Sequence, residues 1–206
     1  MAKMILVRHG HVEGIEPARF RGRRDVPLTA EGERQARAAA ACIATRWRPV
    51  AVYTSPLRRC VETGREIAAA CGLDAAVLEE LIDLDYGAWE WRTREEVGAG
   101  WPERYEQWVK APHLVRFPQG ESLQDLVART ANVIRYVLER HAAETVVLVG
   151  HDSGIRTMLL QLLDQPLSAY WRLGPEPGAL GEVDVLAHGA KVLRFNDAGH
   201  LAPPAR

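Results

Sequence analysis

Thr145-Val-Val-Leu-Val149, followed directly by Gly150-His151-Asp152-Ser153-Gly154, is the stretch that decides the fold class. Its first five residues form an uninterrupted run of β-branched and apolar residues, which predicts a strand buried on both faces. The segment from Ile155 to Leu163 is predicted to be the helix that follows. A strand, a glycine-bearing turn and a helix in this order are typical of an α/β protein with a parallel sheet.

The same alternation extends through the rest of the chain. Met4-Ile-Leu-Val7 predicts a first buried strand, Thr29 is a suitable N-cap for a helix, and Ser55-Pro56 supplies an N-cap and a first helical proline. Further strands are expected at 50–53, 75–78, 181–187 and 191–195, and further helices at 29–46, 55–71 and 123–141. We therefore predict a three-layer α/β sandwich with a central, mostly parallel sheet.

The length of 206 residues fits one compact domain, and we expect a single domain over residues 1–206. Residues 81–120 lack a clear period and are predicted to form an irregular cap insertion. This segment holds four of the six tryptophans, which we interpret as packing anchors rather than a substrate cage: Trp89, Trp91, Trp101 and Trp108. The last residues, 201–206, are expected to be frayed.

The charge balance excludes some classes of partner. With 26 basic and 27 acidic residues, the net charge of -1 gives no field to attract nucleic acid or an anionic membrane. The first apolar run is too short for a signal peptide or a membrane span. Cys42, Cys60 and Cys71 are odd in number and lack metal-ligand spacing, which favours a reducing cytoplasm over a disulfide framework or a zinc site. A homodimer remains open.

Basic side chains follow three of the expected strands at the point where each strand ends. His9 follows the first strand with Arg8, Arg59 opens the helix after the second, and His151 follows the fourth. Ligands of parallel sheets bind beyond the carboxyl ends of the strands, so we expect these side chains to converge. A neutral imidazole can attack phosphorus, and guanidinium groups are shaped to hold phosphoryl oxygens.

Each of these features is weak alone, because a lone histidine at a strand end is more often structural. The four residues taken together are stronger evidence for a functional site than any one of them alone. Gly10 and Gly154 allow a close backbone approach, and a helix that starts near Ser153 would direct N–H groups at an anion. Together these residues predict a phosphoryl-transfer site.

The motifs match a known family. The sequence resembles the histidine phosphatase superfamily, in its phosphoglycerate-mutase-like branch, from about residue 4 to residue 156. The matching motifs are Leu6-Val-Arg-His-Gly10, Arg21-Gly22, Asp25-Val-Pro-Leu-Thr29 with Gly32, Tyr53-Thr-Ser-Pro-Leu-Arg-Arg59 with Thr63, Leu81-Ile-Asp83 with Tyr86-Gly87 and Trp89-Glu90, Gly120-Glu-Ser-Leu123, and Gly150-His151.

The resemblance implies a phosphoglycerate-mutase-like fold and a set of roles. His9 would be the nucleophile that becomes phosphohistidine, Asp83 the proton donor, and Arg8, Arg59 and His151 the groups that hold the phosphoryl group. The remaining substrate-binding candidates are Gly10, Arg21, Gly22, Asp152 and Ser153. Neither a metal nor another cofactor is implied.

Three positions depart from the family pattern. Asp83 stands where the family usually has glutamate, and Asp152 follows the second histidine as it does in the phytase-like branch, where that aspartate is the acid. We favour Asp83 as the donor and keep Asp152 as the alternative, its simpler interpretation being an acid at a helix N-terminus. Ile15 replaces an asparagine near the phosphate, and His11 could substitute in part or be a surface residue.

These residues predict a metal-independent phosphatase that acts on a small phosphorylated metabolite. A cofactor-dependent phosphoglycerate mutase and a catalytically inactive phosphate-binding relative are the alternatives. Six residues are candidates for shaping the pocket: Phe20, Arg21, Arg24, Tyr86 and the Glu121-Ser122 loop.

Overall fold

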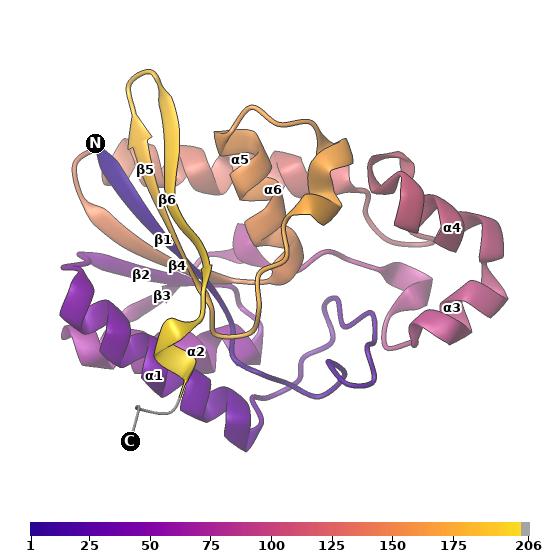
Figure 1. Ribbon diagram of the computed structural model, residues 1–206, viewed down its shortest axis with the longest axis horizontal. Coiled ribbons are helices and arrows are strands. Elements are labelled where there is room, and N and C mark those ends of the chain that lie inside the picture. The colour runs from indigo at the N-terminus through magenta and orange to yellow at the C-terminus, as the bar shows by residue number, and fades with distance from the viewer. Residues whose placement is uncertain (203–206) are drawn as a thin grey trace.

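The computed structural model describes residues 1–202, which are built around one six-stranded sheet of order β3-β2-β4-β1-β5-β6 (Figure 1). The strands are β1 (Ala2–Arg8), β2 (Ala51–Thr54), β3 (Ala75–Val77), β4 (Thr145–Gly150), β5 (Leu180–Leu186) and β6 (Gly189–Asp197). The first four strands in this order are parallel, β5 is antiparallel to β1, and β6 is antiparallel to β5. The predicted mostly parallel sheet is confirmed.

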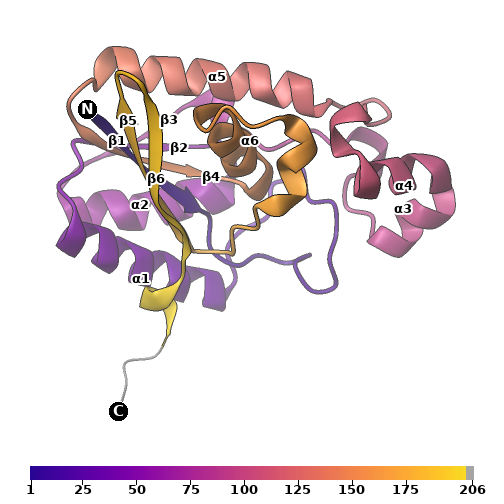
Figure 2. The ribbon, with the colours of Figure 1, turned by 45° about the horizontal axis from the view of Figure 1, so that its top comes forward.

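Helices cover both faces of the sheet, which makes three layers (Figure 2). The helices α1 (Ala30–Arg46) and α2 (Arg58–Cys71) pack on one face, and α5 (Leu123–Arg140) and α6 (Asp152–Leu162) pack on the other. Val147 and Val149 face the first layer, whereas Val146 and Leu148 face the second. All four are completely buried, as the apolar run predicts for a central strand.

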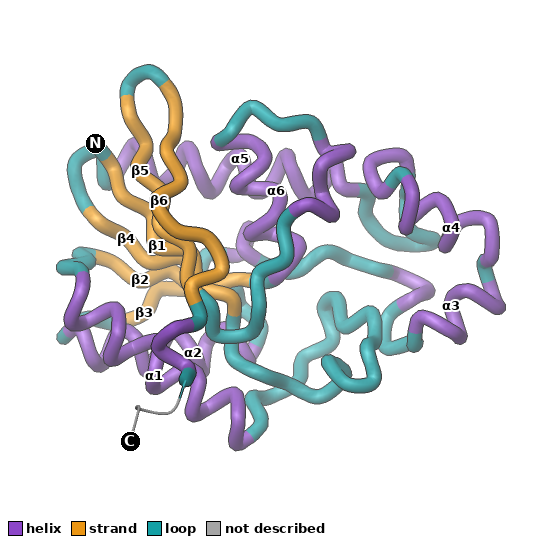
Figure 3. The backbone as a smooth tube through the Cα atoms, viewed as in Figure 1, coloured by secondary structure: helices purple, strands orange, loops and turns teal. Residues whose placement is uncertain are grey.

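The segment 81–120 contains two helices, so the expected irregular structure is wrong there. The helices α3 (Arg94–Gly100) and α4 (Pro102–Lys110) lie away from the sheet (Figures 1 and 3). Thr93 and Glu96 form a capping box that starts α3, and Pro102 starts α4. Two short helices with their own caps carry too little periodicity to stand out in a sequence.

Aromatic side chains pack this segment together. Trp89 is completely buried against Phe20 and Phe117, and Trp108 is 3% exposed against Phe117 and Tyr170. Most of the cap tryptophans therefore act as the predicted packing anchors.

Two helix starts differ from expectation. The helix α2 begins at Arg58 with Leu57 as its N-cap and no side-chain cap, because the Ser55 hydroxyl accepts from the Leu57 N–H and bonds to His151 instead. The helix α6 begins at Asp152, three residues before the expected Ile155.

Of the helices described, none has the length and apolar character needed to cross a bilayer. Residues 203–206 of the expected frayed end lie outside the described part of the chain.

Candidate active site

His9 lies just beyond β1, at the edge of a cavity of about 500 Å³. Its Nδ1 lies 2.7 Å from the carbonyl oxygen of Gly10. Burial, together with the charges of Arg59 and Arg8, lowers the pKa of His9 well below its usual value, so the ring is neutral. Because a carbonyl only accepts hydrogen bonds, Nδ1 carries the proton and Nε2 keeps a lone pair.

His151 is the N-cap residue of α6, and its ring lies 5.3 Å from that of His9 between centroids. Arg59 Nε donates to its Nδ1 over 3.3 Å, and its Nε2 lies 2.8 Å from the Ser55 hydroxyl. Burial and the nearby guanidinium groups lower its pKa well below the usual value. His151 is therefore neutral, with Nε2 protonated, and both of its nitrogens are bonded to protein groups.

Arg59 is completely buried in the first turn of α2 and is not among the residues that line the cavity. It donates to the carbonyl oxygens of Gly22 and Arg24 over 2.7 and 2.8 Å, and to Oδ2 of Asp83 over 3.2 Å. With the bond to His151, four of its five N–H groups have protein acceptors. Arg59 therefore organises the surrounding groups and lies behind the cavity wall.

Two other arginines keep donors that lack acceptors. Arg8 donates from Nη1 to the carbonyl of Pro175 over 2.6 Å, and Arg21 donates from Nη1 to that of Gly14 over 2.7 Å. The Nε atoms of both are buried without a partner in the described residues. Burial is the largest cause that lowers the pKa of each. Arg21 lines the cavity with His9, whereas Arg8 and His151 are not among its lining residues. An unpaired cationic donor is suited to an anionic oxygen.

Asp83 lines the cavity and joins several elements through its carboxylate. Its Oδ1 accepts from the Leu84 N–H over 2.9 Å and from the Ser153 hydroxyl. Its Oδ2 accepts from Arg59 and lies 3.6 Å from Nδ1 of His151. The residue predicted to be the proton donor therefore lies among the other predicted catalytic groups.

Asp152 also lines the cavity but is paired differently. Its Oδ1 accepts from Nε of Arg156 over 2.8 Å, one turn further along α6. Arg156 also donates to the carbonyl of Tyr170 over 3.0 Å and stacks on the rings of Tyr170 and Trp171. Both acids are thus paired with an arginine, Asp83 with Arg59 beside the histidines and Asp152 with Arg156 on the same helix.

The predicted glycines differ in what they do. A side chain at Gly10 would collide with the backbone of Gly32, so the close approach at Gly10 is to α1 rather than to a ligand. A side chain at Gly154 would meet no protein atom within 4 Å, and Gly154 is not among the residues that line the cavity. Gly22 lies on the cavity wall with φ at +49°, where a side chain would meet Glu90.

The sequence-predicted pocket residues divide into two groups. Phe20, Arg21 and Tyr86 line the cavity, whereas Arg24, Glu121 and Ser122 do not. The Arg24 guanidinium stacks on Trp91 at 4.6 Å, and Ser122 is the N-cap of α5. His11 bonds to Thr29 and also lies outside the cavity wall.

Sequence reasoning missed the far half of the cavity. These residues come from the cap helices, from α6 and from the turn after it: Arg94, Tyr105, Trp108, Val109, Arg156, Tyr170 and Trp171. Trp108 was interpreted mainly as a packing anchor, and the other six belong to segments without a recognised motif. Within residues 1–202, no three His, Cys, Asp or Glu side chains gather as a metal site would require.

Comparisons with known proteins agree with this geometry. The chain is 34% identical over 201 residues to phosphoserine phosphatase 1 of Hydrogenobacter thermophilus, covering 98% of this chain and 95% of that protein. It is 32% identical over 210 residues to "Probable phosphoglycerate mutase GpmB" of Yersinia enterocolitica, covering 100% and 97%. The solved structure of YhfR from Bacillus stearothermophilus has a TM-score of 0.92 at 25% identity, covering 98% and 100%.

The sequence profile of the histidine phosphatase superfamily (branch 1) matches residues 4–198. This match spans nearly the whole chain, and it agrees with the six-stranded sheet. The chain belongs to the histidine phosphatase superfamily, branch 1.

Proposed function

We propose that this protein is a phosphatase that hydrolyses a small phosphomonoester through a phosphohistidine at His9. The main support for this proposal is the tautomer of His9. Its Nδ1 is protonated against the Gly10 carbonyl, which leaves the lone pair of Nε2 available to attack phosphorus. The similarity to a phosphoserine phosphatase supports a small metabolite as the substrate.

In the first step, Nε2 of His9 forms a bond to phosphorus while the ester P–O bond breaks. The leaving oxygen takes a proton from Asp83, and the alcohol departs. Positive charge develops on the imidazole as the bond forms, and the hydrogen bond from Nδ1 to Gly10 stabilises it.

In the second step, water attacks the phosphorus of phosphohistidine and gives a proton to the Asp83 carboxylate. The bond from Nε2 to phosphorus breaks, which releases phosphate and restores neutral His9 with protonated Asp83. The unpartnered Nε atoms of Arg8 and Arg21 are the groups we assign to the phosphoryl oxygens in both steps.

The far half of the cavity would hold the alcohol part of the substrate. Aromatic side chains, among them Trp108 and Tyr170, line it, and Arg156 adds a guanidinium whose Nη2 has no acceptor among the described residues. An alcohol that carries an anionic group, such as a carboxylate, would complement this donor. Phosphoserine and phosphoglycerate both meet this requirement.

A cofactor-dependent phosphoglycerate mutase is the second candidate, favoured by the similarity to the mutase-named relative. A mutase must keep its phosphohistidine away from water until a second acceptor arrives. Val109 and Trp171 on the cavity wall are 52% and 43% exposed, which supports access of water and hence hydrolysis. The presence of His9, His151, Arg8 and Arg59 argues against the third candidate, an inactive phosphate-binding relative.

The proposed reaction uses arginines instead of a metal ion to stabilise charge. Arg8 and Arg21 have free buried donors, and the buried charge of Arg59 adds to the positive potential at His9.

Cys42, Cys60 and Cys71 are all free thiols, which supports the proposed cytoplasmic setting.

Trapping of the intermediate tests this function. The enzyme is mixed with labelled phosphoserine or, separately, labelled p-nitrophenyl phosphate, and the reaction is quenched after a short time. The expected product is an acid-labile, base-stable phosphoprotein. His9→Asn should abolish both turnover and trapping. The matched control is His11→Asn, which alters a histidine on the same loop outside the cavity wall and should retain both. Label on serine, cysteine or aspartate would refute the phosphohistidine, and interconversion of phosphoglycerates without hydrolysis would favour the mutase.

A further inference from the structure

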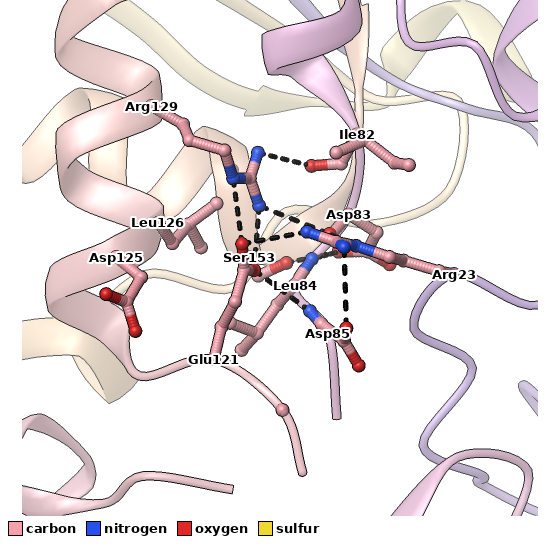
Figure 4. A network of polar contacts seen from close by, with 12 residues as sticks. Arg23, Ile82, Asp83, Leu84, Asp85, Glu121, Asp125, Leu126, Arg129 and Ser153 are labelled. Carbon is pink, nitrogen blue, oxygen red and sulfur yellow. Dashed lines mark hydrogen bonds and ion pairs between the residues drawn. The ribbon is translucent and has the colours of Figure 1, made fainter. Parts of the chain in front are cut away.

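A network of polar contacts surrounds the backbone of Asp83 (Figure 4). Arg129, on α5, donates from Nη1 to the carbonyl oxygens of Glu80 and Ile82, each over 2.9 Å. Its Nη2 donates to the carbonyl oxygen of Asp83 over 3.3 Å. One guanidinium group thus holds three carbonyls of the segment that carries the proposed acid.

Glu121 fixes the orientation of that guanidinium. Its Oε1 accepts from Nε of Arg129 over 3.0 Å, and its Oε2 accepts from Nη2 over 2.9 Å, which is a two-point contact (Figure 4). Oε2 also accepts from the Asp85 N–H over 3.1 Å. The two side chains are 20% and 17% exposed, so solvent screens the pair only in part.

Arg23 extends the network to the loop that carries Arg21 and Gly22. Its Nη2 donates to Oε1 of Glu121 over 2.8 Å, and its Nε reaches the Asp83 carbonyl over 3.4 Å. The Asp83 carbonyl therefore accepts from two arginines on different segments. The loop beside the cavity and the segment that carries Asp83 therefore both bond to Glu121.

The local backbone gives Asp83 little support of its own. The residues between the short helical turns Glu79–Leu81 and Gly87–Trp89 belong to no helix or strand. A backbone hydrogen bond from the Glu121 N–H to the Asp85 carbonyl, over 3.0 Å, and the side chain of Arg129 both hold this segment in place. A shift of about 1 Å in a catalytic group can cost about 100-fold in rate, so the position of the Asp83 carboxyl depends on these contacts.

We propose that Arg129, oriented by Glu121, is a positioning residue that holds the Asp83 backbone so that its carboxyl reaches the leaving oxygen of the substrate. The inference rests on the proposed function, in which Asp83 protonates that oxygen. Among the residues to which Arg129 donates hydrogen bonds, Asp83 alone lines the cavity. It acts through Asp83.

The test compares two esters. Protonation of the leaving group matters for an alkyl phosphate and little for p-nitrophenyl phosphate. Arg129→Lys retains the charge but cannot hold three carbonyls and Glu121 at once. We expect kcat for phosphoserine to fall by about 10- to 100-fold, the range typical of groups that orient catalytic residues, with KM and p-nitrophenyl phosphate turnover nearly unchanged.

Three further variants make the result decisive. Arg135→Lys alters an exposed arginine on the same helix and should have no effect. Glu121→Gln should give a weaker form of the same selective loss. In the double variant Asp83→Asn/Arg129→Lys, the loss on phosphoserine should be no greater than for Asp83→Asn alone, because the two residues act as a unit.

Equal losses on both esters, or additive losses in the double variant, would overturn the positioning role. Thermal unfolding of each variant identifies one that has simply lost its fold, and Glu121→Gln then carries the comparison. If Asp83→Asn shows no selective loss, the proposed acid is wrong. If Asp83→Asn shows it and neither Arg129→Lys nor Glu121→Gln does, only this inference fails.

Discussion

Nη2 of Arg59 lies 3.2 Å from Oδ2 of Asp83, and the arginine side chain is completely buried. The contact joins the residue predicted to hold phosphate to the residue predicted to give a proton. Because protein acceptors take most of its N–H groups, Arg59 aligns Asp83 and His151 and adds positive potential at His9. For Arg59 to bind the phosphate directly, it would have to break one of these hydrogen bonds to a protein acceptor.

Arg59→Lys should lower kcat by roughly 100-fold on any ester, the scale expected when catalytic groups such as Asp83 and His151 are displaced by about 1 Å. A lysine ammonium cannot bond to His151, Asp83 and two carbonyls in their present directions. Steady-state kinetics with p-nitrophenyl phosphate measure the effect. The matched control is Arg58→Lys, an exposed neighbour paired with Glu62, which should leave kcat unchanged. Near-normal kinetics for Arg59→Lys would exclude Arg59 from the site.

Turnover should survive EDTA within a factor of about two, because guanidinium groups supply the charge stabilisation in the proposed mechanism. The measurement is the rate of p-nitrophenyl phosphate hydrolysis before and after incubation with chelator. Dialysis into metal-free buffer with added sodium serves as the control for ionic strength. A loss of activity that magnesium or zinc restores would contradict this prediction.

The sheet and most of its helices were predictable from the sequence because they depend on local patterns. The run at 145–149 is buried on both faces, and Thr29 caps α1 by accepting from the Gly32 N–H. The start of α2 was not predictable in this way. Ser55 has the chemistry of an N-cap, but its hydroxyl bonds to His151, which lies 96 residues away. A long-range contact of this kind leaves no local signal.

The same distinction applies to the site. Strand ends and motifs identified His9 and Asp83, which line the cavity. They did not identify Arg156 or Tyr170, because the packing of α6 against the following turn brings these residues to the cavity. Nor did they indicate that Glu121 would contact Arg129 instead of substrate, since that depends on where α5 packs beside the Asp83 segment.

Acid should destabilise the protein partly through its buried histidines. Burial lowers the pKa of His9 in the native state, whereas the unfolded chain protonates it below about pH 6.5. The unfolded state therefore binds more protons below that pH, and the free energy of unfolding falls as pH falls. Above pH 6.5 both states are neutral, and this contribution is constant.

His9→Asn removes the titration, so its free energy of unfolding should fall less steeply between pH 6.5 and pH 5 than that of the wild type. The difference in slope should approach about 1.4 kcal/mol per pH unit. Urea denaturation at several pH values measures it, and the carboxylates common to both proteins cancel in the comparison. Parallel curves would show that His9 is protonated in the native state.

The identity of the acid is the last prediction. Asp83 contacts Arg59 and Ser153 beside the histidines, whereas the Asp152 carboxylate is paired with Arg156. Each carboxylate is paired with an arginine, but Asp83 also lies 3.6 Å from Nδ1 of His151, among the other proposed catalytic groups, so we expect Asp83 to be the donor. Asp83→Asn should reduce turnover of phosphoserine by about 100-fold or more, within the range known for general acids, and reduce p-nitrophenyl phosphate turnover much less. Asp152→Asn should affect both esters similarly and mildly. The reverse pattern, with the selective loss in Asp152→Asn, would assign the proton to the residue beside the second histidine and leave Asp83 with a structural role.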